Sequence, residues 1–273
     1  MRYQKISPSP RLQQYVRGYY VLEHSSQLST PFEVKSSVNP TYAFVFNYGD
    51  CYQLCNPTVG NETVPSCFLT GISLSNYILR FSGTVGCCGI LLWGTAFQNL
   101  LPTPPAEELL DRRVDLRVLL GNKADEVTEQ IKAASGDQER IMVLEQFMLD
   151  LLEKSPNADT PIDHAVDSIL RKRGMLSMDE LANEVCMSPR QLRRKFKTKV
   201  GIGPKTYARL KRFNYINHCL SSNPNLSWKE FINYGGFYDQ SHFIKEFMGL
   251  SGENPMKYIH QRKSLREQLL RSS

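Results

Sequence analysis

Short apolar runs with a two-residue period dominate the first hundred residues. Aromatic side chains at Tyr42, Phe44, Phe46 and Tyr48 alternate with smaller residues, and this run ends at a Gly-Asp pair. Alternation that stops at a turn signal predicts a strand. Residues 12–22 are apolar and aromatic enough for a short helix turn that runs into a strand, and further short apolar runs occupy residues 66–71, 76–81 and 85–94. Four or five strands at this spacing predict a small β-sandwich or barrel.

The apolar period changes to that of a helix after residue 100. Residues 100–121 open with prolines and end at Gly121, a plausible helix stop, and residues 123–134 and 138–153 have amphipathic patterns. A wide apolar stripe in the last segment has two interpretations, packing on its own domain or contact with a second copy. The polar stretch KSPNADTP, residues 154–161, is the predicted linker, and only helical patterns follow from residue 162.

One sequence unit occurs twice in the C-terminal part. Residues 176–207 match residues 226–258 at an offset of 50 before a short turn and 51 after it. The matched pairs include Leu192/Phe243, Phe196/Phe247, Gly201/Gly252, Pro204/Pro255 and Tyr207/Tyr258. Two copies of one supersecondary unit explain this correspondence.

Each copy predicts two short helices joined by a tight turn. Ser177 and Ser227 are each followed three residues later by Glu, the capping-box arrangement that begins a helix. After the turn, Ser188 and Asp239 are the predicted caps of the second helix. Short helix, turn and second helix together are typical of a helix-turn-helix.

A single helix is predicted between the copies, over residues 204–222. Its length of roughly 27 Å would hold the units apart at fixed distance. Successive major-groove faces of B-DNA lie about 34 Å apart, so the separation suits two units on adjacent turns.

Charge is divided unevenly along the 273 residues. Residues 1–155 hold 13 Lys/Arg and 16 Asp/Glu, a net of −3, whereas residues 156–273 hold 20 and 11, a net of +9. Residues 190–212 contain ten Lys/Arg and no Asp/Glu. A solvated helix face normally mixes both signs, so this segment indicates DNA binding, with a sensing or assembly domain before it.

Positions along the second helices assign roles to the candidate contacts. Early residues point at base edges, which selects Arg190 and Gln191, whereas Arg194, one turn on, is a candidate for a base contact or a phosphate contact. In copy two the outward set is Gln240, Ser241, His242 and Lys245, and Glu246 is also expected to face outward. For His242 a local hydrogen bond and a DNA contact both stay open. Phosphate contacts are expected from Lys195, Lys197, Lys199, Arg209, Lys211 and Arg212.

The seven cysteines read as reduced thiols, because the N-terminus lacks the apolar region of a secretory signal. No apolar run approaches a membrane span, so a cytoplasmic protein is expected. A metal site is not expected, since His24 is the only histidine in residues 1–155.

The C-terminal residues resemble the AraC/XylS family of bacterial transcription regulators. The residues that carry the resemblance are MDELANEVCMSPRQLRRKFKTKVGIGP and GGFYDQSHFIKEF followed by GENP and Tyr258. The resemblance covers about residues 162–262. It implies a C-terminal all-α domain of seven helices with two helix-turn-helix motifs, whose recognition helices begin at Ser188 and Asp239 and lie in adjacent major grooves.

The N-terminal segments LQQYVRGYYVLE, YAFVFNYGD and FLTGIS look like the effector domain of a subset of these regulators. The implied fold class is an α+β multidomain protein, with a cupin-like β-barrel and trailing helices over residues 1–153, a linker over 154–161 and the DNA-binding domain over 162–273. Expected partners are double-stranded DNA, a small-molecule effector, RNA polymerase and a second copy of the chain, without a cofactor.

Two alternatives stay open. The cysteines, including the Cys87-Cys88 pair, would suit a thiol-dependent enzyme or alkyl-group sensor joined to the DNA-binding domain. A basic protein that binds DNA without sequence preference is the other. The barrel aromatics either fill a core or line an effector pocket, and the core interpretation is favoured.

Overall fold

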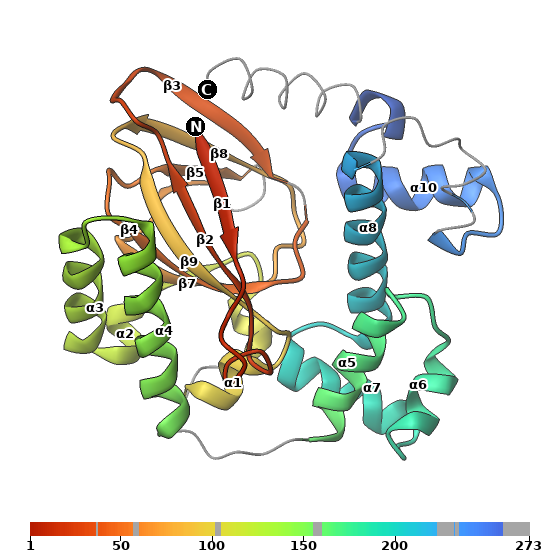
Figure 1. Cartoon of the computed structure of the whole chain (residues 1–273). Helices are drawn as coiled ribbons and strands as arrows, with labels where there is room; N and C mark the ends of the chain where they lie inside the picture. Colours follow the sequence, from red (N-terminus) through yellow and green to blue (C-terminus); the bar gives the residue numbers. More distant parts are fainter. Residues whose placement is uncertain are drawn as a thin grey trace.

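A β-rich domain and a helical domain lie side by side in the computed structural model (Figure 1). The structure describes residues 1–36, 38–56, 60–101, 105–154, 160–222, 232 and 235–258. All strands come from residues 1–115, and the helical domain begins at residue 161. The predicted division into a β-rich and an all-helical part is confirmed.

Two antiparallel sheets face each other in the N-terminal domain. The first has the order β1-β2-β9-β4-β7-β10, with β1 Arg2–Ile6, β2 Val16–Glu23, β9 Gly86–Leu92, β4 Tyr42–Asn47, β7 Cys67–Thr70 and β10 Arg113–Asp115. The second has the order β3-β8-β5-β6, with β3 Leu28–Ser36, β8 Tyr77–Gly83, β5 Gln53–Asn56 and β6 Gly60–Thr63. This pair of sheets is the cupin-like barrel that the sequence led us to expect.

Strand β4 is buried on both faces, although its alternating pattern is typical of a half-buried strand. Ala43 and Val45 face the second sheet, where they pack in one cluster with Phe81. Phe44 and Phe46 face away from it, and both place their rings against the edge of Phe147, at 5.7 and 5.8 Å between centroids. The aromatic residues of β4 therefore fill a core beneath the helices.

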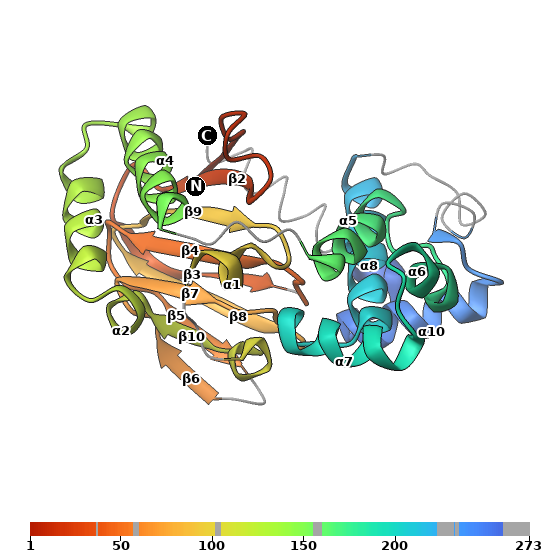
Figure 2. The ribbon, with the colours of Figure 1, turned by 90° about the horizontal axis from the view of Figure 1, so that it is seen from below.

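Helices cover the outer face of the first sheet (Figure 2). They are α1 Ala96–Leu100, η1 Ala106–Leu109, α2 Leu116–Leu120, α3 Asn122–Ala133 and α4 Asp137–Glu153. Gly121, with φ of +56°, ends α2 as predicted. The apolar stripe of α4 packs on its own domain through Leu144, Phe147 and Met148, each nearly fully buried.

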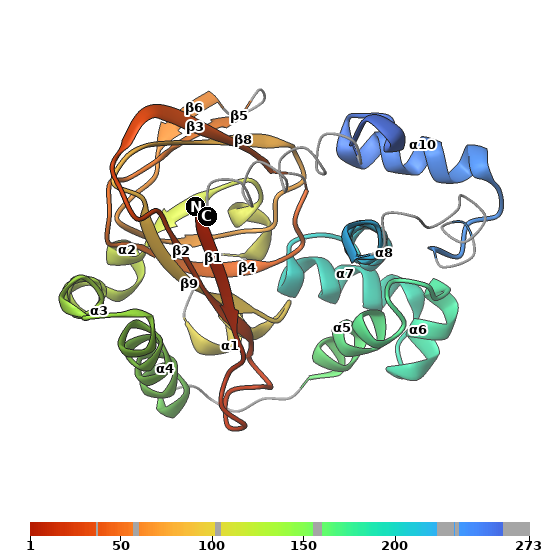
Figure 3. The same ribbon diagram turned by 45° about the horizontal axis from the view of Figure 1, so that its top comes forward.

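The helical domain is built around one long helix. It contains α5 Pro161–Arg171, α6 Met178–Glu184, α7 Pro189–Val200, α8 Pro204–Ser222 and α10 Gln240–Ser251. Helix α8 has the predicted bounds, and Figure 3 shows α5, α6 and α7 on one side of it with α10 on the other. Most of the first helix predicted for copy two, with its cap Ser227, lies outside the described residues.

Candidate nucleic-acid interface

The first helix-turn-helix is formed by α6 and α7. Ser177 accepts a hydrogen bond from the amide of Glu180, and the Glu180 carboxylate accepts one from the Ser177 amide, both at 3.1 Å. Ser188 and Gln191 form the same reciprocal cap at the start of α7. Between the helices, Cys186 has a φ of +51°. Both predicted caps and the turn are confirmed in this copy.

The second unit repeats the geometry of the turn. Gly236, which aligns with Cys186, has a φ of +61°. The amide of Phe237 donates to the carbonyl of Ile232 at 3.0 Å, as that of Met187 donates to Ala182 at 2.9 Å in the first unit. Equal hydrogen bonds at aligned positions show that the sequence repeat is a structural repeat.

The second unit also has its own cap and stop. The carboxylate of Asp239 accepts a hydrogen bond of 2.7 Å from the amide of His242, as predicted. Gly201 and Gly252 end α7 and α10 with left-handed φ of +86° and +73°. The extra residue of this turn is Tyr238, whose side chain is 93% exposed. The insertion therefore adds an exposed tyrosine directly before Asp239, the cap of α10.

Helix α7 has a basic face without acidic partners. Leu192, Phe196 and Val200 are buried, which leaves the polar side chains outside. The exposed residues without an ion-pair partner in the described part of the chain are Arg190, Arg193, Arg194 and Lys195. Gln191 is exposed too, but its side-chain oxygen accepts from the Ser188 amide and so serves the cap. The face carries uncompensated positive charge, as a polyanion requires.

The outward face of α10 is mostly neutral. Gln240, Ser241 and Lys245 are exposed. His242 lies 5.4 Å from the Phe237 ring, between centroids, and its Nε2 is 3.5 Å from a carboxylate oxygen of Glu246. Glu246 does not face outward as expected, because its side chain is only 10% exposed.

Several of the predicted phosphate contacts are held by carboxylates within the protein. Lys197 lies 2.9 Å from Glu107, and Lys199 lies 2.8 Å from Asp163. Both carboxylates lie far from α7 along the chain, so the pattern of the helix could not predict them. The two arginines of α8 lie near the carboxylate of Glu246, with Arg212 at 2.5 Å and Arg209 at 3.6 Å. These cations are half-buried or partnered, unlike Lys195.

Lys211 is set apart from the other cations of α8. Its Nζ lies 4.9 Å from the centroid of the Tyr207 ring, and the side chain is half-buried. Burial, aided by the charge of Arg17, lowers the pKa of Lys211 to about 7. Because Arg17 belongs to β2, this lysine faces the N-terminal domain.

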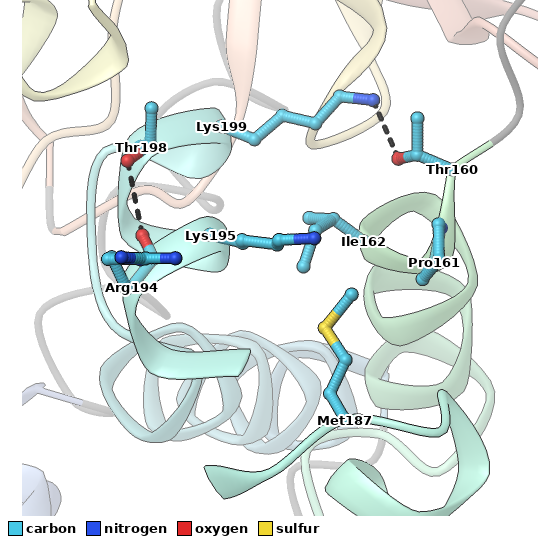
Figure 4. A pocket seen from close by; sticks show the side chains of 8 residues that line it. All are labelled: Thr160, Pro161, Ile162, Met187, Arg194, Lys195, Thr198 and Lys199. Atoms are coloured by element: carbon cyan, nitrogen blue, oxygen red, sulfur yellow. Dashed lines mark hydrogen bonds between the residues drawn. The ribbon is translucent and has the colours of Figure 1, made fainter. Parts of the chain in front are cut away.

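A cleft of about 410 Å³ separates the start of α5 from α7 (Figure 4). The Lys195 side chain points into it toward Ile162, and Lys199 reaches across to Thr160 at 2.9 Å. Asp163 binds Lys199 and also accepts hydrogen bonds from Thr160 and from Thr95 of the N-terminal domain. Burial opposes ionisation of Asp163, but these hydrogen bonds outweigh it and hold the pKa below its usual value.

The last turn of α7 packs directly on the N-terminal domain. The Tyr42 hydroxyl donates to the backbone carbonyl of Val200 at 3.0 Å, and the Tyr42 ring stacks on Phe97. Gly201 approaches so closely that an added Cβ would lie 2.7 Å from the carbonyl oxygen of Ala106. Gly201 thus ends α7 and also forms a close contact between the domains.

The geometry does not favour a reactive thiol at Cys87 or Cys88, or a metal site within the described residues. Cys87 and Cys88 are buried, and burial raises the pKa of both thiols, that of Cys87 to about 12. A neutral thiol is a poor nucleophile. Within the described residues, no group of three His, Cys, Asp or Glu side chains could hold a metal ion. No helix in that part is long and apolar enough to cross a membrane.

Comparisons with known proteins agree with the two-domain organisation. A family described as a helix-turn-helix domain matches residues 181–261, and one described as a domain of unknown function (DUF6597) matches residues 4–115. The chain is 29% identical over 121 residues to the Msm operon regulatory protein of Streptococcus mutans. That match covers 42% of this chain and 42% of the relative.

Two solved structures are partly similar to this chain. ToxT from Vibrio cholerae has a TM-score of 0.49 at 11% identity, over 89% of this chain and 97% of that one. The DNA-binding domain of AdpA, solved in complex with a target DNA, has a TM-score of 0.38 at 22% identity, over 40% of this chain and 99% of that domain.

The residues that the helix-turn-helix family matches contain α7, α8 and α10. Helices α7 and α10 are the aligned helices of the repeat, each with a side-chain cap, and α8 is the long helix between them. Residues 181–261 therefore form a helix-turn-helix domain of the family that this model describes.

Proposed function

We propose that this protein is a sequence-specific, DNA-binding regulator of transcription. The observation that carries the proposal is the structural repeat: α7 and α10 begin at equivalent caps and expose their first turns. Helix α8, of 19 residues, spans about 27 Å and separates the two units. Two recognition helices at this separation suit adjacent major-groove faces of one duplex.

Helix α7 supplies most of the base recognition in this proposal. Arg190 and Arg194 lie one turn apart and are free to donate two hydrogen bonds each to guanine. Gln191 uses its oxygen in the cap, so its amide nitrogen is the group available to an acceptor on a base. In α10 the corresponding contacts come from Gln240, Ser241 and Lys245, with His242 held partly by Glu246.

The phosphate contacts fall into two groups. Lys195 has no acidic partner and can contact the backbone directly. Lys197 must exchange Glu107 for a phosphate, and that exchange couples DNA binding to the N-terminal domain. Lys199, Arg209, Lys211 and Arg212 would support the interface from inside the domain.

The contacts of α7 with the N-terminal domain support control by an effector. Tyr42, on β4, and Glu107, on η1, both hold the end of this helix. A small molecule that shifts either element would change how α7 meets DNA. The N-terminal domain is therefore the proposed effector domain, with RNA polymerase and a second copy of the chain as further partners and the cytoplasm as the location.

Footprinting on DNA selected from a random pool tests the proposal. A single chain should protect about 17–20 base pairs, because its two units lie one helical turn apart. Replacing Gln240 and Lys245 by alanine should shorten the protected region to the side bound by α7. A short footprint that these replacements do not change would contradict the two-unit proposal.

A further inference from the structure

The two recognition helices carry charges of opposite sign at one equivalent position. At the offset of 51, Glu246 of α10 aligns with Lys195 of α7. Lys195 is exposed and has no acidic partner, whereas the Glu246 side chain is 10% exposed. A carboxylate repels DNA, so its presence in the second recognition helix needs a reason within the protein.

The surroundings of Glu246 supply that reason. One carboxylate oxygen lies 2.5 Å from Nη2 of Arg212 and 3.6 Å from Nε of Arg209, and the other lies 3.5 Å from His242. Both arginines belong to α8, the helix that links the two units. A lysine at this position, as in copy one, would place a third cation against two arginines.

The ion pair sits over an aromatic contact between the same helices. Arg212 lies 4.6 Å from the centroid of the Phe237 ring, and its side chain is 15% exposed. Phe213 of α8 and Phe247 of α10 place their ring centroids 5.1 Å apart. Apolar packing holds the helices together but is tolerant of sliding, whereas a short charge-assisted pair has one preferred geometry.

We propose that Glu246 is a positioning residue that fixes α10 on α8 and so sets the distance and rotation between the two recognition helices. This inference rests on the proposed function. Glu246 contacts no base in this proposal. It acts through Arg212, and the arginines of α8 then serve the geometry of the protein rather than binding phosphate directly.

The inference predicts a specific change in how DNA spacing is tolerated. Inserting one base pair between two boxes moves the second box along the duplex and rotates it, which a rigid pair of helices resists. The wild-type protein should therefore lose affinity sharply on that insertion. Glu246→Gln should lose about tenfold on the original two-box site, and the insertion should then cost much less.

Affinities for random DNA and for a one-box site distinguish a positioning role of Glu246 from simple repulsion of phosphate by its charge. Removing a negative charge should leave binding to random DNA unchanged or stronger, because Arg209 is released. Binding to DNA with only the α7 box should stay the same. Equal gains in affinity for the two-box site, the one-box site and random DNA would show that Glu246 only repels phosphate, and would overturn the inference.

The experiment measures binding of the full chain to four DNA molecules by fluorescence anisotropy: the two-box site selected by the wild type, its one-base-pair insertion, a one-box site and random DNA. Glu253→Gln is the matched control. Glu253 pairs with Lys35 of β3 at 3.3 Å rather than with an arginine of α8, so this variant should keep the wild-type spacing preference.

A second test exchanges the two charges of the pair, and so distinguishes loss of the ion pair from loss of folding in the single variant. Arg212→Glu combined with Glu246→Arg restores the pair with its charges reversed, and should recover the spacing preference that Arg212→Glu alone loses. An unchanged spacing preference in Glu246→Gln, or no recovery in the exchange, would overturn the inference. If the wild type selects no two-box site at all, the proposed function itself fails.

Discussion

The hydroxyl of Tyr42 donates a 3.0 Å hydrogen bond to the backbone carbonyl of Val200, so a central strand of the N-terminal domain holds the last residue of the recognition helix α7. Helix ends leave carbonyls without partners, and here the other domain satisfies one. The Tyr42 ring is buried against Phe97, with 3.9 Å between centroids. Packing therefore positions the hydroxyl, and a shift of β4 would reach α7 without passing through the linker.

Tyr42→Phe should remove this hydrogen bond while keeping the ring. We expect a loss of about 1 kcal/mol in the free energy of unfolding, because the Val200 carbonyl stays buried without its donor. Chemical denaturation of the full chain measures it. Any response of DNA affinity to an effector should also weaken in this variant.

Tyr19→Phe is the control for that measurement. Tyr19 is fully buried, and its hydroxyl has no hydrogen-bond partner in the described structure. Removing an unsatisfied hydroxyl should leave stability unchanged or raise it. Equal losses in the two variants would mean that the Tyr42 hydroxyl contributes nothing specific.

Asp163→Asn should loosen the second tie between the domains. The carboxylate binds Lys199 of α7 and Thr95 of the N-terminal domain, and both charged side chains are about 15% exposed. We expect a loss of about 2 kcal/mol in the free energy of unfolding, a value between those of exposed and buried ion pairs. Glu129→Gln, in an exposed pair with Lys132, should change stability by less than about 0.5 kcal/mol.

The effect of Asp163 has a defined pH dependence. Its folded-state pKa lies below the usual value, so the ionised group stabilises the fold above the unfolded pKa of about 4. That contribution is lost as the pH falls through the folded pKa. The stability difference between wild type and Asp163→Asn should be full at pH 6 and shrink toward pH 2. A difference that stays constant over this range would contradict the assignment.

Local features of this fold follow from the sequence because neighbouring residues determine them. The Ser188 cap needs only the amide and side chain of Gln191, three residues away. Helix α8 has no Gly or Pro after Pro204, and its bounds were predicted correctly. The repeat made the second cap at Asp239 predictable from the first.

Features that depend on distant residues were not predictable in the same way. Lys199 and Arg212 have the composition of phosphate contacts, but their carboxylate partners lie 36 and 34 residues away. Strand β1 was missed because its exposed, polar residues lack an apolar alternation, and β3 was missed although Phe32 and Val34 alternate with Glu33 and Lys35. Cross-strand pairing with β2 and β8 specifies them instead.

Lys211→Met should stabilise the protein in a pH-dependent way. Burial lowers the folded-state pKa of this lysine to about 7, against about 10.4 in an unfolded chain. Between these values the unfolded state binds the extra proton, so wild-type stability rises with pH. The gain from methionine should therefore be largest below pH 7 and fall toward zero near pH 10. Thermal unfolding at pH 6, 8 and 10 measures it.

Lys205→Met is the control for Lys211, since Lys205 is an exposed lysine in the first turn of the same helix. It should show no such pH trend. A gain for Lys211→Met that is independent of pH would indicate better packing rather than relief of a buried charge.

Alanine variants of Arg190 and Lys195 should distinguish sequence recognition from general affinity for DNA. Both are exposed on α7 without acidic partners, but Arg190 lies in the first turn, where base edges are reached. Arg190→Ala should weaken the selected site by about 1–3 kcal/mol and random DNA far less. Lys195→Ala should weaken both alike and lower the slope of log affinity against log salt by about 1. Competition binding at several salt concentrations measures both effects, and equal profiles for the two variants would refute the division of roles.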